Sequence, residues 1–182
     1  MAATTLFDAC FAALIGNEGG LSLEQSDPGN WTGGRVGVGR LLGTNWGISA
    51  AAYPMLDIAT LTRAAAAAIY LQRYWGPIGA EHLPPPLALL AFDAAVNLGV
   101  AGAAKLLQLA IGAEEDGLVG PATLAAAARS IGAVGLNAVC AEFLARRLMF
   151  TVALPTWRTF GLGWARRLCR LPFQAQAIPT AA

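Results

Sequence analysis

Apolar side chains recur every three to four residues along most of this chain, which is the spacing of one face of an α-helix. The first set with this spacing comprises Leu6, Cys10, Phe11, Leu14 and Ile15. It predicts a helix over residues 5–18, for which Thr4 or Thr5 is the expected N-cap. Glu18 then lies in the last turn, at the edge of the apolar stripe.

The same helical spacing dominates the rest of the chain. The segments that show it are LTRAAAAAIYLQRYW (61–75), LALLAFDAAVNLGV (87–100), AGAAKLLQLAIG (101–112), AVGLNAVCAEFLARRLMF (133–150) and FGLGWARRLCRL (160–171). Thr60 or Thr62 is expected to cap the first of these segments. Pro121 suits the first turn of a further helix, where its missing N–H needs no partner. We expect the tail after Pro172 to be frayed.

Residues 21–47 lack this pattern and are rich in glycine. Six glycines fall between Gly29 and Gly43, around short apolar pieces such as RVGVGRLL. Glycine clusters mark turns, and short apolar pieces between turns are typical of weak strands. The sequence therefore predicts a mainly α fold with a small glycine-rich β-hairpin or loop lobe after the first helix.

The composition limits what such a fold could bind. The chain has 182 residues, of which 56% are hydrophobic and 13% charged, and its formal net charge is +1. This balance offers no basic surface to a nucleic-acid backbone, so nucleic acid is not an expected partner. The length suits one compact domain, or one domain with an appended lobe.

Cysteine and histidine are sparse, which argues against metal centres and disulfide frameworks. Cys10, Cys140 and Cys169 are far apart, odd in number and form no C-x-x-C pair. The single histidine, His82, lies in the proline-rich turn AEHLPPPL, where we expect it to be exposed. No metal and no cofactor are expected.

No stretch has the pattern of a membrane span or a cleavable signal. The first twenty residues lack a basic start, and Asp8 interrupts their apolar run. Charged residues break the longer candidates at Asp93, Lys105 and Arg129. We expect a monomer that is made in the cytoplasm without stable membrane insertion, and that needs another component to reach the outside.

Glu18 lies between an almost uncharged apolar segment and two glycines, Gly19 and Gly20, either of which could end the helix. The negative end of the helix dipole and a partly apolar surround are both expected to raise the pKa of this carboxyl group. A carboxylic acid that stays protonated near neutral pH is what a glycosidase uses to protonate the leaving sugar oxygen. A solvated glutamate at a helix end is the alternative interpretation.

A second carboxylate follows in the turn SDPGN. Asp27 could orient an attacking water or stabilise positive charge on a sugar, and Glu24 is a further candidate for this role. The alternative for Asp27 is structural, because an aspartate in such a turn often caps its own backbone. The spacing leaves both interpretations open, and also an inverting or a retaining outcome.

Several short blocks follow one another along the chain in an informative order. They are NEGG, SDPGN, GTNWGIS, YLQRYW, LPPPLALLAFDAAVNLG, LLQLAIGAEEDGLVGPATL and FGLGWARRL. Together they resemble the N-acetylmuramidases of glycoside hydrolase family 108, whose opening pattern is E-G-G, a D-P-G-G turn and T-N-Y-G-I. The resemblance covers nearly the whole chain and implies a lysozyme-like fold. It also implies cleavage of the β-1,4 bond between N-acetylmuramic acid and N-acetylglucosamine, as in phage endolysins and hydrolases that help proteins leave Gram-negative cells.

The resemblance also implies roles for individual residues. The family's catalytic glutamate corresponds to Glu18, its turn aspartate to Asp27 and its motif threonine to Thr44, which by analogy with phage lysozymes would help to hold water. Asn45 and Trp46 follow the threonine and are expected substrate contacts.

The segment NWTGGRVGVGRLLG, residues 30–43, departs from the family pattern because it separates the aspartate turn from the threonine. It is interpreted as an inserted hairpin that borders the cleft. The insertion leaves Thr32 as a rival to Thr44 for the position of the motif threonine. Leu21 stands where a tyrosine is usual in the family, and Glu24 where an aspartate is common.

The second half of the chain is similar to the predicted peptidoglycan-binding region attached to this family. The matching residues are Leu107, Gln108, Asp116, Gly117, Gly120 and Thr123. The alternative is structural, since a helix, a tight turn and a helix N-cap need the same residue types. We expect a lysozyme-like catalytic region over 1–100 and a helical C-terminal region over 101–182, packed as one compact unit.

A few polar residues remain outside these motifs. Tyr53 is a further candidate for contact with a sugar, although most such aromatic residues pack in the core. Asp93 and Asn97 lie one turn apart on an apolar helix, where a buried hydrogen-bonded pair and a pair that lines a substrate cleft are both plausible. The C-terminal arginines are expected on helix surfaces, namely Arg146, Arg147, Arg166, Arg167 and Arg170.

The leading hypothesis is a metal-independent muramidase that acts on peptidoglycan glycan strands, for host-cell lysis or for wall remodelling during release or secretion. It would reach the periplasm through a holin or an export channel. The alternatives are a lytic transglycosylase, a non-catalytic peptidoglycan-binding secretion accessory and a membrane-active helical protein.

Overall fold

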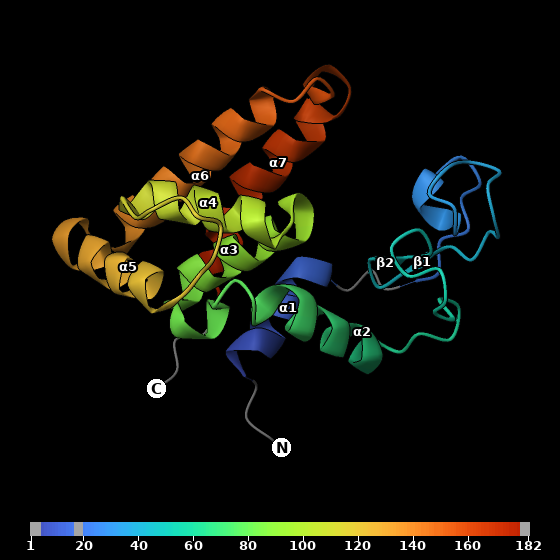
Figure 1. Cartoon of the computed structure of the whole chain (residues 1–182), viewed down its shortest axis with the longest axis horizontal. Helices are drawn as coiled ribbons and strands as arrows, with labels where there is room; N and C mark the ends of the chain where they lie inside the picture. Colours follow the sequence, from blue (N-terminus) through green and yellow to red (C-terminus); the bar gives the residue numbers. More distant parts are fainter. Residues whose placement is uncertain (1–4, 17–19, 179–182) are drawn as a thin grey trace. The chain divides into compact units, whose positions relative to one another are not determined.

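The computed structural model describes residues 5–16 and 20–178, and Figure 1 shows its elements. The chain forms two compact units, one made of Met1–Cys10 with Leu71–Ala182 and the other of Phe11–Tyr70. Helices make up most of the described residues, which confirms the predicted mainly α fold. The predicted division at residue 100 separates a catalytic from a binding region, and it stays a prediction.

The larger unit is a group of helices packed around one central helix, α3. Its long helices are α3 (Pro85–Leu98), α4 (Val100–Ile111), α5 (Pro121–Val134), α6 (Leu136–Val152) and α7 (Trp157–Gln176). Every side chain of α3 from Leu87 to Ala95 is buried, and α3 contacts α4, α6 and α7 (Figure 1). A helix that is apolar on nearly all sides has to lie in a core, which explains this position.

Single glycines separate consecutive helices of this unit. Gly99 lies between α3 and α4 with a φ of 79°, and Gly135 between α5 and α6 with a φ of 87°. Such backbone angles suit glycine and interrupt a helix. The break near Gly99 was predicted, whereas the break at Gly135 starts α6 three residues later than expected.

The C-terminal helix is longer than the sequence indicates. α7 continues through Pro172 to Gln176, so the prediction of a frayed tail after Pro172 is wrong. Leu171 and Ala175 are 2% and 3% exposed, and their burial holds this turn in place despite the proline. Among the described residues, no single helix is long and apolar enough to span a membrane, and α5 and α6 pass that test only as a pair bent by 116°.

The first helix, α1 (Leu6–Ile15), begins with a reciprocal cap. Thr5 Oγ1 accepts from the amide of Asp8, and Asp8 Oδ2 accepts from the amide of Thr5, both at 3.1 Å. This confirms Thr5 as the N-cap. The described helix ends at Ile15, short of the predicted residue 18, because Gly16 takes a φ of 67° and its amide closes the last turn.

The smaller unit, residues 11–70, holds the glycine-rich lobe. Its elements are the 3₁₀ turn η1 (Pro28–Asn30), the strands β1 (Thr44–Asn45) and β2 (Ile48–Ser49), and the helix α2 (Arg63–Tyr70). The strands pair antiparallel, and a bridge between Trp31 and Leu41 closes the predicted hairpin. Thr62 caps α2, as predicted, by accepting from the amide of Ala65 at 3.2 Å.

Two short segments follow α2 in the larger unit. They are η2, a π-helical turn over Leu71–Trp75, and η3, a 3₁₀ turn over Ala80–His82. The aromatic ring of Trp75 packs against the rings of Phe7 and Phe92, with centroid distances of 5.5 and 5.3 Å. These contacts hold Phe7 of α1 against α3.

Candidate active site

The glycine-rich lobe is organised around one buried side chain, Asn30. Asn30 is 0% exposed, and its Nδ2 donates to the carbonyl oxygen of Glu24 at 2.9 Å. Its Oδ1 accepts from Thr44 Oγ1 at 2.7 Å, and its backbone carbonyl accepts from the amides of Leu42 and Gly43, both at 3.0 Å. Asn30 therefore joins three segments of the lobe. No sequence pattern singles out Asn30, because an asparagine after Pro-Gly has the pattern of an ordinary turn residue.

Thr44 is held from two sides. Its backbone exchanges hydrogen bonds with Ser22 at 2.8 and 2.9 Å, and its hydroxyl meets Asn30. Because Asn30 Nδ2 is committed to a carbonyl, Asn30 Oδ1 is the acceptor and the Thr44 hydroxyl is the donor. Among the described residues nothing donates to Thr44 Oγ1, so its lone pairs can accept from a water or a sugar hydroxyl.

The rival threonine, Thr32, lies in the hairpin. Its Oγ1 accepts from the amide of Arg40 at 2.9 Å and so supports the pairing of the two hairpin arms. Thr44 as the motif threonine stays a prediction. It is the one whose hydroxyl is oriented by a buried side chain.

Asp27 is the N-cap of η1. Its Oδ1 accepts from the amide of Gly29 at 2.8 Å, and its backbone carbonyl accepts from the amide of Asn30 at 3.1 Å. One carboxylate oxygen of Asp27 therefore caps the backbone of its own turn, as the structural alternative predicted. Its Oδ2 accepts no hydrogen bond from any described residue, and the side chain is exposed, so the same carboxylate can still orient a water.

Glu24, the further carboxylate of this lobe, is engaged locally. Its Oε1 accepts from the amide of Ser26 at 3.1 Å and from the Ser26 hydroxyl at 2.9 Å. These two hydrogen bonds lower the pKa of Glu24, and the carboxylate stays ionised at neutral pH. An ionised carboxylate that caps its own turn has a structural role, and the role of Glu24 in orienting a water or stabilising positive charge stays a prediction.

The polar groups of Asn45 and Trp46 point into the unit. Asn45 is 7% exposed, and its Nδ2 donates to the carbonyls of Ile58 and Leu61 at 3.1 and 3.3 Å. Trp46 Nε1 donates to the Leu61 carbonyl at 3.1 Å, while the Trp46 carbonyl accepts from the Tyr70 hydroxyl at 3.3 Å. These hydrogen bonds fix the motif segment. The Trp46 ring, which is half-buried, remains a predicted sugar contact.

Tyr53 and Glu18 are the remaining predicted site residues of this part of the chain. Tyr53 is half-buried, and its amide donates to the Ser49 carbonyl at 3.0 Å, so its contact with a sugar stays a prediction. Glu18, the predicted acid, lies outside the described residues. A pocket of about 330 Å³ in the same unit is lined by Arg40, Leu42, Pro54, Met55, Leu56 and Asp57.

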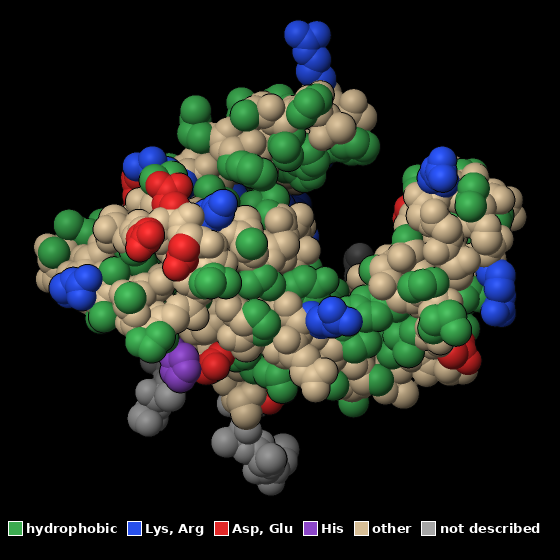
Figure 2. Space-filling model, viewed as in Figure 1, with side chains coloured by type: hydrophobic (Ala, Val, Ile, Leu, Met, Phe, Trp, Pro, Cys, Tyr) green, Lys and Arg blue, Asp and Glu red, His purple; other side chains and the backbone are tan. Residues whose placement is uncertain are grey.

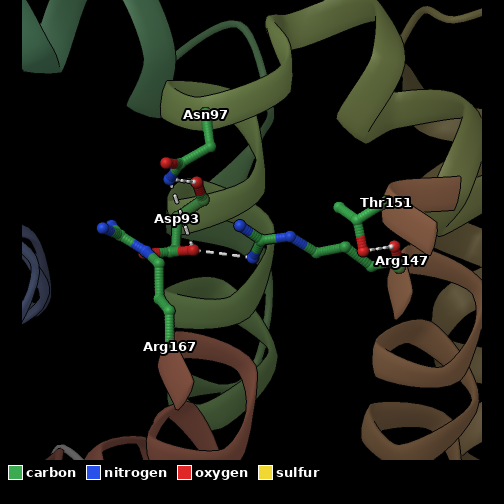
Figure 3. Close-up of polar contacts among 5 residues, drawn as sticks. All are labelled: Asp93, Asn97, Arg147, Thr151 and Arg167. Atoms are coloured by element: carbon green, nitrogen blue, oxygen red, sulfur yellow. Dashed lines mark hydrogen bonds and ion pairs between the residues drawn. The ribbon is translucent and has the colours of Figure 1, made fainter. Parts of the chain in front are cut away.

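Asp93 and Asn97 belong to the larger unit, where Asp93 is buried in an ion-pair cluster. Asp93 pairs with Arg147 of α6 and Arg167 of α7, and Asn97 Nδ2 donates to the Asp93 carbonyl at 2.7 Å (Figure 3). The prediction that Arg147 lies on a helix surface is wrong, because its side chain is 3% exposed and faces Asp93. Contact of Asp93 and Asn97 with substrate stays a prediction.

Gln108 holds the turn that resembles a wall-binding motif. Gln108 is 1% exposed, its Nε2 donates to Asp116 Oδ1 at 2.6 Å and to the Leu118 carbonyl at 2.9 Å, and its Oε1 accepts from the Gly117 amide at 2.9 Å. Thr123 Oγ1 donates to the same Leu118 carbonyl at 3.2 Å. Each of these motif residues therefore has a structural task, and binding of wall polymer by them remains a prediction.

Neither the surface charges nor the residue types that bind metals indicate a further site among the described residues. His82 is exposed, as predicted, with its Nε2 3.5 Å from Glu81 Oε1. Lys and Arg side chains are scattered over the visible face rather than gathered into one field (Figure 2). Within residues 5–16 and 20–178, no three His, Cys, Asp or Glu side chains lie close enough to hold a metal ion.

The comparisons with known proteins bear on the lobe that carries Asp27 and Thr44. Residues 11–99 match the family model described as glycosyl hydrolase 108. Over these residues, just under half of the chain, the sequence is similar to glycosyl hydrolase family 108. The match includes the positions of Glu18, Asp27 and Thr44, and it supports a glycoside hydrolase.

The structural comparison covers the whole chain. The solved structure of Brucella abortus SagA has a TM-score of 0.78 and 28% sequence identity, over 99% of this chain and 99% of that one. No curated protein matches the sequence. The family and this structural neighbour together support a peptidoglycan hydrolase.

Proposed function

We propose that this chain is an N-acetylmuramidase that cleaves the β-1,4 bond between N-acetylmuramic acid and N-acetylglucosamine in peptidoglycan. The observation that carries the proposal is the glycosyl hydrolase 108 match over residues 11–99. In this proposal Glu18 gives its proton to the glycosidic oxygen, which leaves with the departing sugar. A water then attacks the sugar carbon and gives up one proton, to the Asp27 carboxylate in an inverting reaction or to the Glu18 carboxylate in a retaining one, and no metal takes part.

The geometry of the lobe supports roles for the other two residues. Thr44 Oγ1 is oriented as an acceptor by Asn30, and Asp27 keeps one carboxylate oxygen unused by described residues. A water that donates one hydrogen bond to Thr44 Oγ1 and one to Asp27 Oδ2 would be held in a single orientation, with its lone pairs pointing in a defined direction. Thr44 and Asp27 would thus position the nucleophile, while Asn30 acts on it only through Thr44.

The test is a zymogram in which purified protein clears a gel that contains peptidoglycan. We expect Glu18→Gln to abolish clearing and to leave the helical circular dichroism unchanged. Glu115→Gln is the matched control, because Glu115 is exposed outside the candidate active site and its variant should retain activity. Clearing by a folded Glu18→Gln protein would overturn the proposal.

Mass spectrometry of the released fragments identifies the reaction. A muramidase leaves a reducing N-acetylmuramic acid end, whereas a lytic transglycosylase leaves an anhydro end. If cleared peptidoglycan contains only anhydro ends, the enzyme is a lytic transglycosylase and the proposed hydrolysis is wrong. Binding to insoluble peptidoglycan without release of fragments would instead favour a wall-binding accessory.

The proposed place of action is the periplasm and the cell wall, reached through a holin or an export channel, with the protein acting as a monomer in lysis or in release. Expression in a Gram-negative host tests this directly. Cells should lyse only when a holin is co-expressed, and size-exclusion chromatography should give the monomer mass. Lysis without any holin or channel would contradict the proposed route.

A further inference from the structure

A cluster of three charged side chains lies where α3, α6 and α7 meet. Arg147 Nη1 lies 2.6 Å from Asp93 Oδ2, and Arg167 donates through Nε at 2.9 Å and through Nη2 to Asp93 Oδ1 (Figure 3). The side chains of Asp93 and Arg147 are 2% and 3% exposed. Two guanidinium groups therefore share a single buried carboxylate, which leaves one positive charge in excess.

The hydrogen-bond donors of the cluster also exceed its acceptors. A carboxylate offers about four acceptor positions, whereas each guanidinium carries about five N–H donors. Asp93 Oδ1 already takes two donors from Arg167, and Oδ2 is shared by Arg147 and by Asn97 Nδ2 at 3.5 Å. Arg147 Nε is buried and has no hydrogen-bond partner among the described residues. The two arginines thus keep donors that Asp93 cannot accept.

A cavity of about 110 Å³ adjoins this cluster. It is lined by Asn97, Leu98, Arg147, Thr151, Leu154, Trp164, Arg167 and Leu168. The lining holds two cations and no acid, and its remaining wall is mostly apolar. The Thr151 hydroxyl donates to the carbonyls of Arg147 and Leu148 at 3.1 and 2.9 Å, and Arg147 Nε has no hydrogen bond to it or to any other described residue.

We propose that this cavity binds a small carboxylate whose short apolar part packs against Leu98, Leu154 and Trp164. The carboxylate would accept the donors that Arg147 and Arg167 do not give to Asp93, and it would balance the excess charge. A cavity of 150 Å³ holds a ring of about six carbon atoms, so 110 Å³ suits a ligand of about four to five non-hydrogen atoms.

Electrostatics and access both favour such a ligand. Burial lowers the pKa of Arg147, Asp93 opposes that effect, and the neighbouring charge of Arg167 adds to it. A second anion would therefore stabilise the charged guanidinium. The Arg167 side chain is 40% exposed and Asn97 is exposed, so the cavity can be reached from solvent at this end.

This ligand could be a free short-chain acid or the carboxyl end of a peptide. The probes are sodium propionate for the first source and N-acetyl-D-alanine for the second, each added to the full-length protein. Only the carboxylate, Cα and methyl group of N-acetyl-D-alanine would enter the cavity, and its acetamide would lie at the end open to solvent. Propionamide is the neutral isostere, and sodium chloride controls for ionic strength. Binding is followed by NMR shifts of the Trp164 indole N–H and the Asn97 side-chain amide.

We expect saturable shifts with one carboxylate or both, at least about tenfold weaker binding of propionamide, and no saturable effect of chloride. The tighter of the two carboxylates identifies the source. The site is refuted if neither carboxylate gives saturable shifts, or if propionamide binds as tightly as propionate.

Variants separate the site from general charge effects. Arg167→Gln should weaken carboxylate binding about tenfold or more, whereas Arg166→Gln, its exposed neighbour on α7, should not change it. Leu154→Trp keeps every charge and fills the cavity, so it should also abolish binding, even if Arg167→Gln does not fold. Equal effects of the two arginine variants, or unchanged binding by Leu154→Trp, would overturn the proposal. Peptidoglycan clearing is a separate readout, so the outcome does not depend on the muramidase proposal.

Discussion

The hydroxyl of Thr44 donates a 2.7 Å hydrogen bond to the side-chain oxygen of Asn30, which is completely buried. The bond fixes the direction in which the Thr44 lone pairs point. Removal of the hydroxyl should therefore affect catalysis, whereas removal of the methyl group should not.

Thr44→Val and Thr44→Ser form the test pair for this relationship. Valine keeps the shape of threonine and loses the hydroxyl, so the rate of fragment release from purified peptidoglycan should fall about tenfold to a hundredfold. Serine keeps the hydroxyl and should retain a rate within a few-fold of the native protein. Similar rates for the two variants, both with native circular dichroism, would show that the hydroxyl does not position the water.

The buried cluster around Asp93 should dominate local stability. Asp93→Asn leaves the buried Arg147 charge without its counter-ion, so the free energy of unfolding should fall by about 3–5 kcal/mol. Urea unfolding followed by circular dichroism measures this loss.

The surface pair Glu142 and Arg146 is the comparison for that experiment. Its atoms approach to 2.5 Å, but both side chains are more than 40% exposed and lie one turn apart on α6. Glu142→Gln should cost only about 0.3–0.5 kcal/mol. A loss for Asp93→Asn as small as this would mean that Arg147 finds another partner.

Gln108 should control the turn at residues 113–120. Gln108→Met removes the side-chain partners of the Gly117 amide and the Leu118 carbonyl, so we expect a loss of about 1–3 kcal/mol and faster amide hydrogen exchange in this turn. Gln72→Met, at an exposed position, should leave both quantities unchanged. Unchanged exchange in Gln108→Met would contradict the structural task assigned to this glutamine.

The same turn should respond to acid. The Leu118 amide and the Gln108 side chain lower the pKa of Asp116 below its ordinary value of 3.8. A lowered pKa stabilises the folded turn above pH 3.8, and this contribution is lost as the pH falls through the lower, folded-state pKa. The NMR shift of the Leu118 amide should therefore stay constant from neutral pH to about pH 5 and change only below pH 3.8.

The three thiols should differ in reactivity. Burial raises the pKa of Cys10 to about 12 and that of Cys140 to about 11, whereas Cys169 is exposed. Because the thiolate is the nucleophile, only about one in 10⁴ Cys10 thiols and one in 10³ Cys140 thiols would be reactive at pH 8. A disulfide reagent should label Cys169 first and the other two only on unfolding. Rapid labelling of a second thiol in the folded protein would contradict the raised pKa values of Cys10, which is buried, and of Cys140, which is half-buried.

The helices could be predicted because their signal is local. Apolar spacing and the cap at Thr5 are written into adjacent residues, and both appear in the structure. The burial of Arg147 could not be predicted in this way, since it depends on Asp93, which lies on another helix and meets it only after packing. The helix break at Gly135 was also hard to predict, because a glycine inside a helical pattern does not by itself indicate a positive φ.

The candidate site divides in a similar way. Asp27 and Thr44 were found from short motifs that stand out in sequence. Asn30, which links them, was missed because its partners, the carbonyl of Glu24 and the hydroxyl of Thr44, come together only through two successive turns. Such a residue has no local pattern of its own.

The packing of Phe7 has a consequence for the order of events on the ribosome. Phe7 contacts Trp75 and Phe92 in the larger unit, yet residues 11–70 form the other unit and are synthesised in between. The rings of Phe11 and Tyr70, at the two ends of that intervening unit, lie 5.3 Å apart. During synthesis Phe7 therefore cannot pack until Trp75 of η2 and Phe92 of α3 have been made, whereas residues 11–70 can already fold.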